Sequence, residues 1–223
     1  MLSFIENIGL ILQRYGAVFA QGLWNTLWLS FVSVFLGTFL GILVALGKLS
    51  RHKLLNGVVS TYIEIIRGTP ILLQLYFFWL ALPNILPSIS DTTCILSALV
   101  VNASAYIAEV IRAGIQAVDA GQREASLSLG MTEGAIMTKV IFPQAIKNIL
   151  PALGNEVIVM IKQTSLASVF FFGELMTAYK QVQSTTFLAL EPLTISGLIY
   201  LFLTVTLSRI TRHFEKRMKQ NER

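Results

Sequence analysis

Residues 15–47 have the sequence YGAVFAQGLWNTLWLSFVSVFLGTFLGILVALG, which contains no charged side chain. A helix needs about 20 apolar residues to cross the hydrocarbon core of a bilayer, so this stretch is more than long enough. A cleaved signal peptide is a poor alternative, because the stretch is too long, lacks a basic start and has no clear small-residue cleavage site. We therefore predict a membrane-spanning helix that stays in the protein.

The composition of the whole chain agrees with a membrane protein. Of its 223 residues, 54% are hydrophobic and 13% are charged, whereas soluble domains carry about 25% charged residues. These values exclude a disordered protein, a coiled coil and most soluble enzymes. A single cysteine excludes a disulfide framework and a cysteine-rich metal site. Further apolar stretches raise the prediction to five membrane helices in one all-α domain covering residues 1–223, and these stretches lie at about 57–82, 92–111, 148–171 and 190–209.

The lysines and arginines are distributed unevenly between the predicted connections. Of 17 such residues, 13 follow the first helix, follow the third helix or lie in the C-terminal tail. Arg14 and Lys180 lie on the opposite side. Because basic residues are retained on the cytoplasmic side, we expect the N-terminus outside and the C-terminus in the cytoplasm. The net charge of +5 then reflects topology, and nucleic acid is not an expected partner.

Gly37 and Gly41 form a small-xxx-small pair on the first helix. Such a pair lets a neighbouring helix pack closely, although glycine is also a common residue of membrane helices without that role.

One extended polar segment, at about 119–147, interrupts the predicted bundle on its cytoplasmic side. Asp119 can cap a short helix, Gly130 suits its end and Thr132 can cap a second helix. The second helix would carry an apolar face made of Ile136, Met137, Val140 and Ile141. Pro143 is expected to stop or redirect it. The segment therefore predicts a helical hairpin that either lies flat on the membrane or fills a groove on a cytoplasmic partner.

The residues of this segment resemble the EAA loop of ABC-importer permeases. Glu124-Ala125-Ser126 is followed after three residues by Gly130, and after nine more by a hydrophobic stretch ending in Pro143. The third position is Ser where Ala is usual. Further blocks resemble the polar amino-acid permease family, namely YIEIIRGTP at 62–70, AYIAEVIRAGIQ at 105–116, PALGNE at 151–156 and KQTSL at 162–166.

This resemblance implies a type I ABC importer permease, the transmembrane subunit of an ATP-driven amino-acid importer in the bacterial cytoplasmic membrane. It implies three protein partners: a second permease subunit (identical or paralogous), an ABC ATPase dimer that binds ATP and Mg²⁺, and an extracytoplasmic solute-binding protein. It assigns coupling to the ATPase to Glu124, Ala125, Ser126, Gly130 and Pro143. The chain itself has no phosphate-binding Gly-x-x-x-x-Gly-Lys-Ser/Thr loop, so we expect no cofactor and no catalysis in this subunit.

Several charged and polar residues lie within predicted helices, where charge is costly. Two i,i+3 pairs, Glu64 with Arg67 and Glu109 with Arg112, are predicted to be structural ion pairs. The candidates for lining the substrate path are Asn155, Glu156, Lys162, Gln163, Thr164 and Ser165. An amino acid carries an ammonium and a carboxylate group, and both need partners when water is removed. Hydrogen bonding between helices of a permease dimer is the alternative for these six residues.

Two other functional classes compete with the importer. An ion-gradient-driven carrier or channel would work without an ATPase, and the long structured cytoplasmic segment speaks against it. An intramembrane enzyme is disfavoured because the sequence has no His-Glu-x-x-His motif, no cluster of metal ligands and no Ser/His pair at a shared depth.

Overall fold

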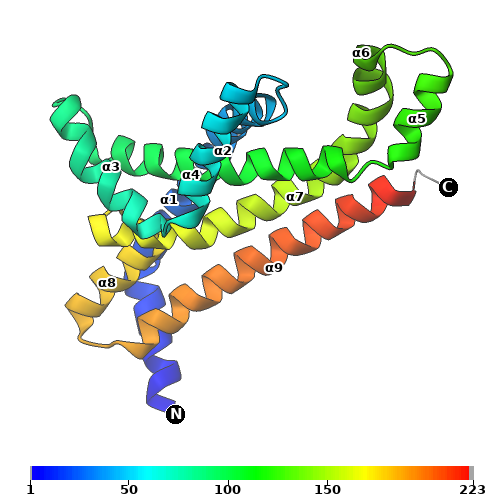
Figure 1. The fold of residues 1–223 in the computed structure, drawn as a ribbon. Coiled ribbons are helices and arrows are strands. Elements are labelled where there is room, and N and C mark those ends of the chain that lie inside the picture. Colours follow the sequence, from blue (N-terminus) through cyan, green and yellow to red (C-terminus); the bar gives the residue numbers. More distant parts are fainter. Residues whose placement is uncertain (1, 221–223) are drawn as a thin grey trace.

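Every regular element of the described chain, residues 2–220 of a computed structural model, is helical (Figure 1). The elements are α1 (Leu2–Lys48), α2 (Lys53–Gly68), α3 (Ile71–Ile85), α4 (Asp91–Gln116), α5 (Ala120–Ser128), α6 (Glu133–Ile136), a π-helical turn (Met137–Ile141), α7 (Phe142–Gln163), a 3₁₀ helix (Thr164–Phe170), α8 (Leu175–Thr186) and α9 (Leu190–Gln220). The predicted all-α fold is confirmed for these residues.

Three helices are long and apolar enough to cross a membrane by length and composition: Ser3–Lys48, Asp91–Gln116 and Leu190–Met218. Two further spans are possible if each bent helix pair counts as one. These pairs are α2 with α3, bent by 107°, and Glu133–Phe170 with α8, bent by 46°. The predicted number of five spans is therefore the upper value that the described residues allow.

The stretch 57–82, which we expected to be one helix, is instead divided between α2 and α3. Thr69 is extended, with φ −117° and ψ 145°, and Pro70 caps α3. The proline ring disfavours helical backbone at the preceding residue, which explains why the helix ends before it. The prediction of one continuous helix here was wrong, although the bent pair can still count as one span.

Pro143 was expected to stop or redirect the helix that precedes it, and it does not stop it. Helical backbone runs without a break from Glu133 to Phe170. A proline has no N–H to donate, and its ring clashes with the carbonyl four residues earlier in a regular α-helix. Here the π-helical turn lies directly before it, and the Phe142 N–H donates to the Met137 carbonyl. This wider turn relieves the conflict, so the hairpin's second helix and α7 form one continuous element.

The predicted glycine pair packs α1 against α4 of the same chain. A Cβ atom on Gly37 would lie 2.6 Å from the Cβ of Ala103, and one on Gly41 would lie 2.9 Å from Cγ2 of Ile107. Only glycine permits this approach without displacing α4. The close packing belongs to the main core, which also takes in side chains of α3, α7 and the 3₁₀ helix. A second core joins the first half of α1 to α8 and α9.

Figure 1 shows how the elements are distributed along the bundle. The α5–α6 hairpin and the C-terminal end of α9 lie at one end, whereas α3 and α8 lie at the other. Two of the three segments that we expect in the cytoplasm thus share one end of the molecule, as the predicted topology requires. The orientation in a membrane stays a prediction.

Candidate functional site

The segment 119–147, called the EAA hairpin below, begins with a capped helix and turns at a glycine. Asp119 caps α5 by accepting the N–H of Gly121 on Oδ1 at 2.8 Å. At the other end of α5, Gly130 has φ +77°, a left-handed conformation that glycine adopts without a Cβ clash. The Met131 N–H then donates to the Ser126 carbonyl at 3.1 Å and closes the turn. The predicted helix end at Gly130 is confirmed.

The two helices of the EAA hairpin are joined by side chains as well as by the turn. Thr132 caps α6 by accepting the Ala135 N–H at 3.4 Å. Arg123 forms an ion pair with Glu133 across the turn, with Nε donating to Oε2 at 3.3 Å. This carboxylate raises the pKa of the Arg123 guanidinium above its ordinary value, mainly through the hydrogen bond. These contacts hold α5 and α6 as one unit.

The signature residues of the EAA hairpin differ in exposure. Glu124 and Ala125 are exposed on α5, and Pro143 is exposed at the start of α7. Ser126 is buried, and its hydroxyl donates to the Gln122 carbonyl at 2.7 Å. A partner could therefore touch the first two positions directly, whereas the serine belongs to the interior of the hairpin.

The apolar face predicted for the second helix mostly packs within the protein. Ile136 is 1% exposed and Ile141 is 7% exposed. Met137 remains 44% exposed, and Leu129 at the turn is 82% exposed. The surface that a partner could bury is therefore centred on the turn rather than on the predicted face.

The candidate substrate-path residues of α7 fall into two groups. Asn155 and Lys162 are exposed, whereas Glu156 and Gln163 are half-buried. None of these four side chains makes a hydrogen bond to another residue within 2–220. Because positions seven apart share a helix face, they form a strip along α7 with unused polar capacity. We call these four residues the α7 polar strip.

Thr164 and Ser165 do not extend this strip. They lie on the 3₁₀ helix that follows α7, and both hydroxyls donate to the backbone. Thr164 donates to the Ile161 carbonyl at 2.8 Å, and Ser165 donates to the Lys162 carbonyl at 2.6 Å. Thr164 is also fully buried. The Thr164 hydroxyl is used inside the protein, so this residue does not line a path in this conformation.

Only one of the two predicted ion pairs forms. Arg112 donates to both carboxylate oxygens of Glu109, at 3.1 Å to Oε1 and 2.8 Å to Oε2. Arg67 does not pair with Glu64. Its Nη1 lies 3.4 Å from Oε2 of Glu109, and its guanidinium stacks 5.3 Å from the centre of the Tyr106 ring. The prediction of a Glu64–Arg67 pair was wrong because Arg67 points from the last turn of α2 towards α4.

These charges surround a cavity of about 450 Å³ between α1, α2 and α4. Its polar lining includes Lys48, Glu64, Arg67, Glu109, Arg112 and Gln116. The positive charge of Arg67 also acts on Glu156 of α7. Glu156 of the α7 polar strip therefore lies within the electrostatic reach of Arg67.

Two buried amides that sequence reasoning missed hold the bend between α2 and α3. The Gln74 side chain donates from Nε2 to the Ile66 carbonyl at 2.7 Å and to Thr69 Oγ1 at 2.9 Å. Its Oε1 accepts from Nδ2 of Asn102 at 2.9 Å. A glutamine in an apolar run after a proline was the available signal, but its partner lies 28 residues away.

A buried acid, Glu174, was also missed. Its carboxylate caps α8 by accepting the N–H groups of Met176 at 2.8 Å and Thr177 at 2.7 Å. The Tyr200 hydroxyl of α9 donates to the same carboxylate at 2.8 Å. Glu174 thus fixes the start of α8 against α9.

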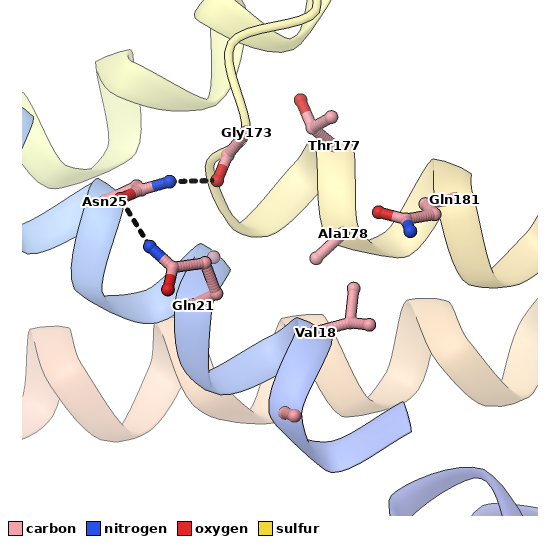
Figure 2. Close-up of a pocket in the computed structure, with 9 residues that line it drawn as sticks. Val18, Gln21, Asn25, Gly173, Thr177, Ala178 and Gln181 are labelled. Carbon is pink, nitrogen blue, oxygen red and sulfur yellow. Dashed lines mark hydrogen bonds between the residues drawn. The ribbon is translucent and has the colours of Figure 1, made fainter. Parts of the chain in front are cut away.

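A further cavity, of about 380 Å³, lies between α1 and α8 at the end of the bundle away from the EAA hairpin. Figure 2 shows Asn25 of α1 donating to the Gly173 carbonyl at 2.7 Å and accepting from Gln21 at 3.0 Å. Thr177 and Gln181 of α8 line its other side. The amide of Asn25 is therefore used to tie the start of α8 to α1.

Comparison with known proteins identifies the family. Residues 37–220 match the family described as "binding-protein-dependent transport system inner membrane component". The chain belongs to this family. As a member, it is 38% identical over 203 residues to the arginine transport system permease protein of Bacillus subtilis (strain 168), across 91% of this chain and 93% of that protein. It is 36% identical over 201 residues to the glutamine transport system permease protein of Escherichia coli (strain K12), across 89% of this chain and 92% of that protein.

Solved structures of ABC transporters have the same fold as this chain. The structure titled "Crystal structure of an amino acid ABC transporter with histidines" matches with a TM-score of 0.90 and 48% identity, over 93% of this chain and 97% of that chain. A methionine ABC transporter in an inward-facing conformation matches with a TM-score of 0.70 and 21% identity, which shows the fold alone. The resemblance to type I ABC permeases is confirmed.

Proposed function

We propose that this permease is the transmembrane subunit of an ATP-driven importer of a polar amino acid. It forms the translocation path with a second permease subunit, identical or paralogous, by alternating access. The similarity to arginine and glutamine permeases supports an amino-acid substrate. The unused polar capacity of the α7 polar strip supports a hydrated path on that face.

The continuity of the helix from Glu133 to Phe170 is the observation that carries this function. At its one end the helix belongs to the EAA hairpin, and along its middle it bears the α7 polar strip. At the other end of the hairpin, three residues separate α5 from α4. A rigid element pushed by a partner moves what it is joined to, so displacement of the hairpin would reorient the polar strip.

The partners follow from this mechanism. An ABC ATPase dimer, which binds ATP and Mg²⁺ and hydrolyses the nucleotide, docks on the EAA hairpin through exposed groups such as Glu124, Ala125 and Leu129. A solute-binding protein delivers the substrate at the opposite end. The N-terminus lies outside, and the EAA hairpin and the C-terminus lie in the cytoplasm of a bacterium, with the chain in the inner membrane.

The substrate's two charged groups find complementary partners in the described residues. Glu156 can accept hydrogen bonds from an ammonium group, and Lys162 and Arg67 offer positive charge to a carboxylate. Gln163 and Asn155 add neutral donors and acceptors. The four side chains of the α7 polar strip make no hydrogen bond within residues 2–220. Substrate binding to them would therefore not require breaking hydrogen bonds inside the protein.

The test is uptake by the complete transporter in proteoliposomes that carry Glu124→Lys or Gly130→Pro. We expect uptake to collapse while membrane insertion survives, because the first change reverses a docking charge and the second forbids φ +77°. Gly134→Ala is the control, since a Cβ there meets nothing within 4 Å. Unchanged uptake in both variants would reject the coupling role. Transport by the purified chain alone under an ion gradient would favour the carrier instead.

A further inference from the structure

An apolar cavity lies beneath the base of the EAA hairpin, between α1, α4 and the start of α7. Its volume is about 510 Å³. The hydroxyl of Thr38, which is the one polar side-chain group in the lining, donates to the Val34 carbonyl at 2.7 Å. The cavity therefore offers no free hydrogen-bonding side chain. The residues on its α1 side are Thr38, Ile42, Ala45, Leu46 and Leu49, which recur at helical spacing along one face.

The dimensions of this cavity limit what can occupy it. From Thr38 to Leu49 the helix rises about 16 Å, close to the thickness of one leaflet, which is about 15 Å of hydrocarbon. A single hydrocarbon chain lying along α1 can span this length, and the apolar lining suits it. A helix of a second subunit lying over the cavity is the competing occupant, and the crosslink described below tests it.

Positive charge continues from one end of the cavity. Arg51 and Lys53 are exposed just beyond Leu49, and successive Cα atoms are 3.8 Å apart, so Arg51 lies within about 8 Å of the lining. No acidic residue occurs in the segment 49–63. The cytoplasmic leaflet carries anionic lipids, and basic side chains near its surface attract them.

We propose that this cavity binds one acyl chain of an anionic phospholipid, whose headgroup is held by Arg51 and Lys53. Met137 and Phe142 also line the cavity, and they belong to the π-helical turn and the start of α7. A bound chain thus fills the space under the EAA hairpin. The choice of the cytoplasmic leaflet rests on the orientation given under the proposed function. Lipid retention is measured without uptake, so the lipid site and the importer function can fail separately.

The first experiment measures phospholipid that copurifies with the complete transporter. Nanodiscs of mixed phosphatidylglycerol and phosphatidylethanolamine are dissolved in detergent, and bound lipid is quantified by native mass spectrometry. Wild type should retain one phosphatidylglycerol per permease chain. Ile42→Trp fills the cavity and should lower the retention of phosphatidylglycerol about tenfold or more. If the tryptophan displaces only two methylene groups of the acyl chain from the cavity, the lost burial already weakens binding by that factor. Leu43→Trp is the matched control, since Leu43 is exposed on α1 outside the lining.

A second pair of variants keeps the test decisive if Ile42→Trp does not fold. Leu46→Phe adds less volume and should lower retention several-fold. Arg51→Gln with Lys53→Gln should leave the cavity intact but abolish the preference for phosphatidylglycerol over phosphatidylethanolamine. Equal retention in wild type and Leu46→Phe would overturn the site, as would a crosslink from Leu46→Cys to the second permease subunit. An unchanged lipid preference in the double variant would overturn the headgroup assignment.

Discussion

The guanidinium of Arg67, at the end of α2, lies 3.4 Å from the carboxylate of Glu109 on α4, measured from Nη1 to Oε2. The same carboxylate accepts hydrogen bonds from Arg112 one turn later. One acid therefore neutralises two cations that come from different helices. This bridge, rather than a pair within α2, ties the end of α2 to α4.

Removing the bridging acid should destabilise the protein. Glu109→Gln leaves two guanidinium groups without their carboxylate, and we expect the free energy of unfolding to fall by about 1–3 kcal/mol. This loss is smaller than for a fully buried ion pair because Arg67 is partly exposed. Thermal unfolding can be followed with a thiol-reactive dye, because Cys94 is a buried free cysteine. Glu64→Gln is the control, with a change within about 0.5 kcal/mol. Equal shifts in both variants would contradict the bridge.

Enlarging the glycines between α1 and α4 should separate these helices. Gly37→Val and Gly41→Val insert carbon atoms where a single Cβ already comes within 2.6 Å and 2.9 Å of α4 side chains. We expect a loss of about 1–3 kcal/mol in each case, measured by the same unfolding assay. Gly57→Ala meets nothing within 4 Å and should be neutral or slightly stabilising. Wild-type stability in both valine variants would show that the helices can move apart freely.

The buried amides at the bend between α2 and α3 should be energetically coupled. Gln74→Leu removes the donor to three acceptors on Ile66 and Thr69 and the acceptor for Asn102, so we expect a cost of about 1–3 kcal/mol. In a double-mutant cycle with Asn102→Ala, the interaction energy should reach about 0.5–3 kcal/mol. Strict additivity of the two changes would mean that the contact contributes nothing to the bend.

The α7 polar strip and the buried hydroxyl beside it should respond differently to substitution. Glu156→Gln removes a charge from the strip and should raise the KM for amino-acid uptake about tenfold, which corresponds to about 1.4 kcal/mol. Thr164→Val should leave the KM unchanged, because that hydroxyl donates to the Ile161 carbonyl inside the protein. The measurement is uptake of labelled arginine and glutamine by the complete transporter in proteoliposomes. A higher KM for Thr164→Val alone would reverse these assignments.

Local features of the EAA hairpin were predictable because their causes lie within a few residues. The caps at Asp119 and Thr132 and the left-handed turn at Gly130 depend on short-range geometry that each residue type favours. At Pro143 the same local reasoning left two outcomes open, a stop or a change of direction. Whether a proline ends a helix depends on what the preceding turn does, and here a π-helical turn accommodates it.

Partner choice among charged and polar side chains was less predictable. Glu109 and Arg112 are three residues apart, and their pairing followed from helix periodicity. The same periodicity placed Arg67 beside Glu64, but the rotamer chosen in the fold faces α4. For Gln74 and Asn102 the sequence offers two isolated polar residues in apolar helices, and only their packing makes them partners.

By itself the sequence determined the membrane character, the all-helical fold and the signature of the permease family, because hydropathy, residue spacing and motif order are properties of the chain. The tertiary structure alone decided that the helix of the EAA hairpin continues into α7, that Arg67 joins Glu109, and that Thr164 turns inward. These outcomes depend on which helix faces lie against one another, and contacts between segments far apart in the chain leave no local pattern to detect.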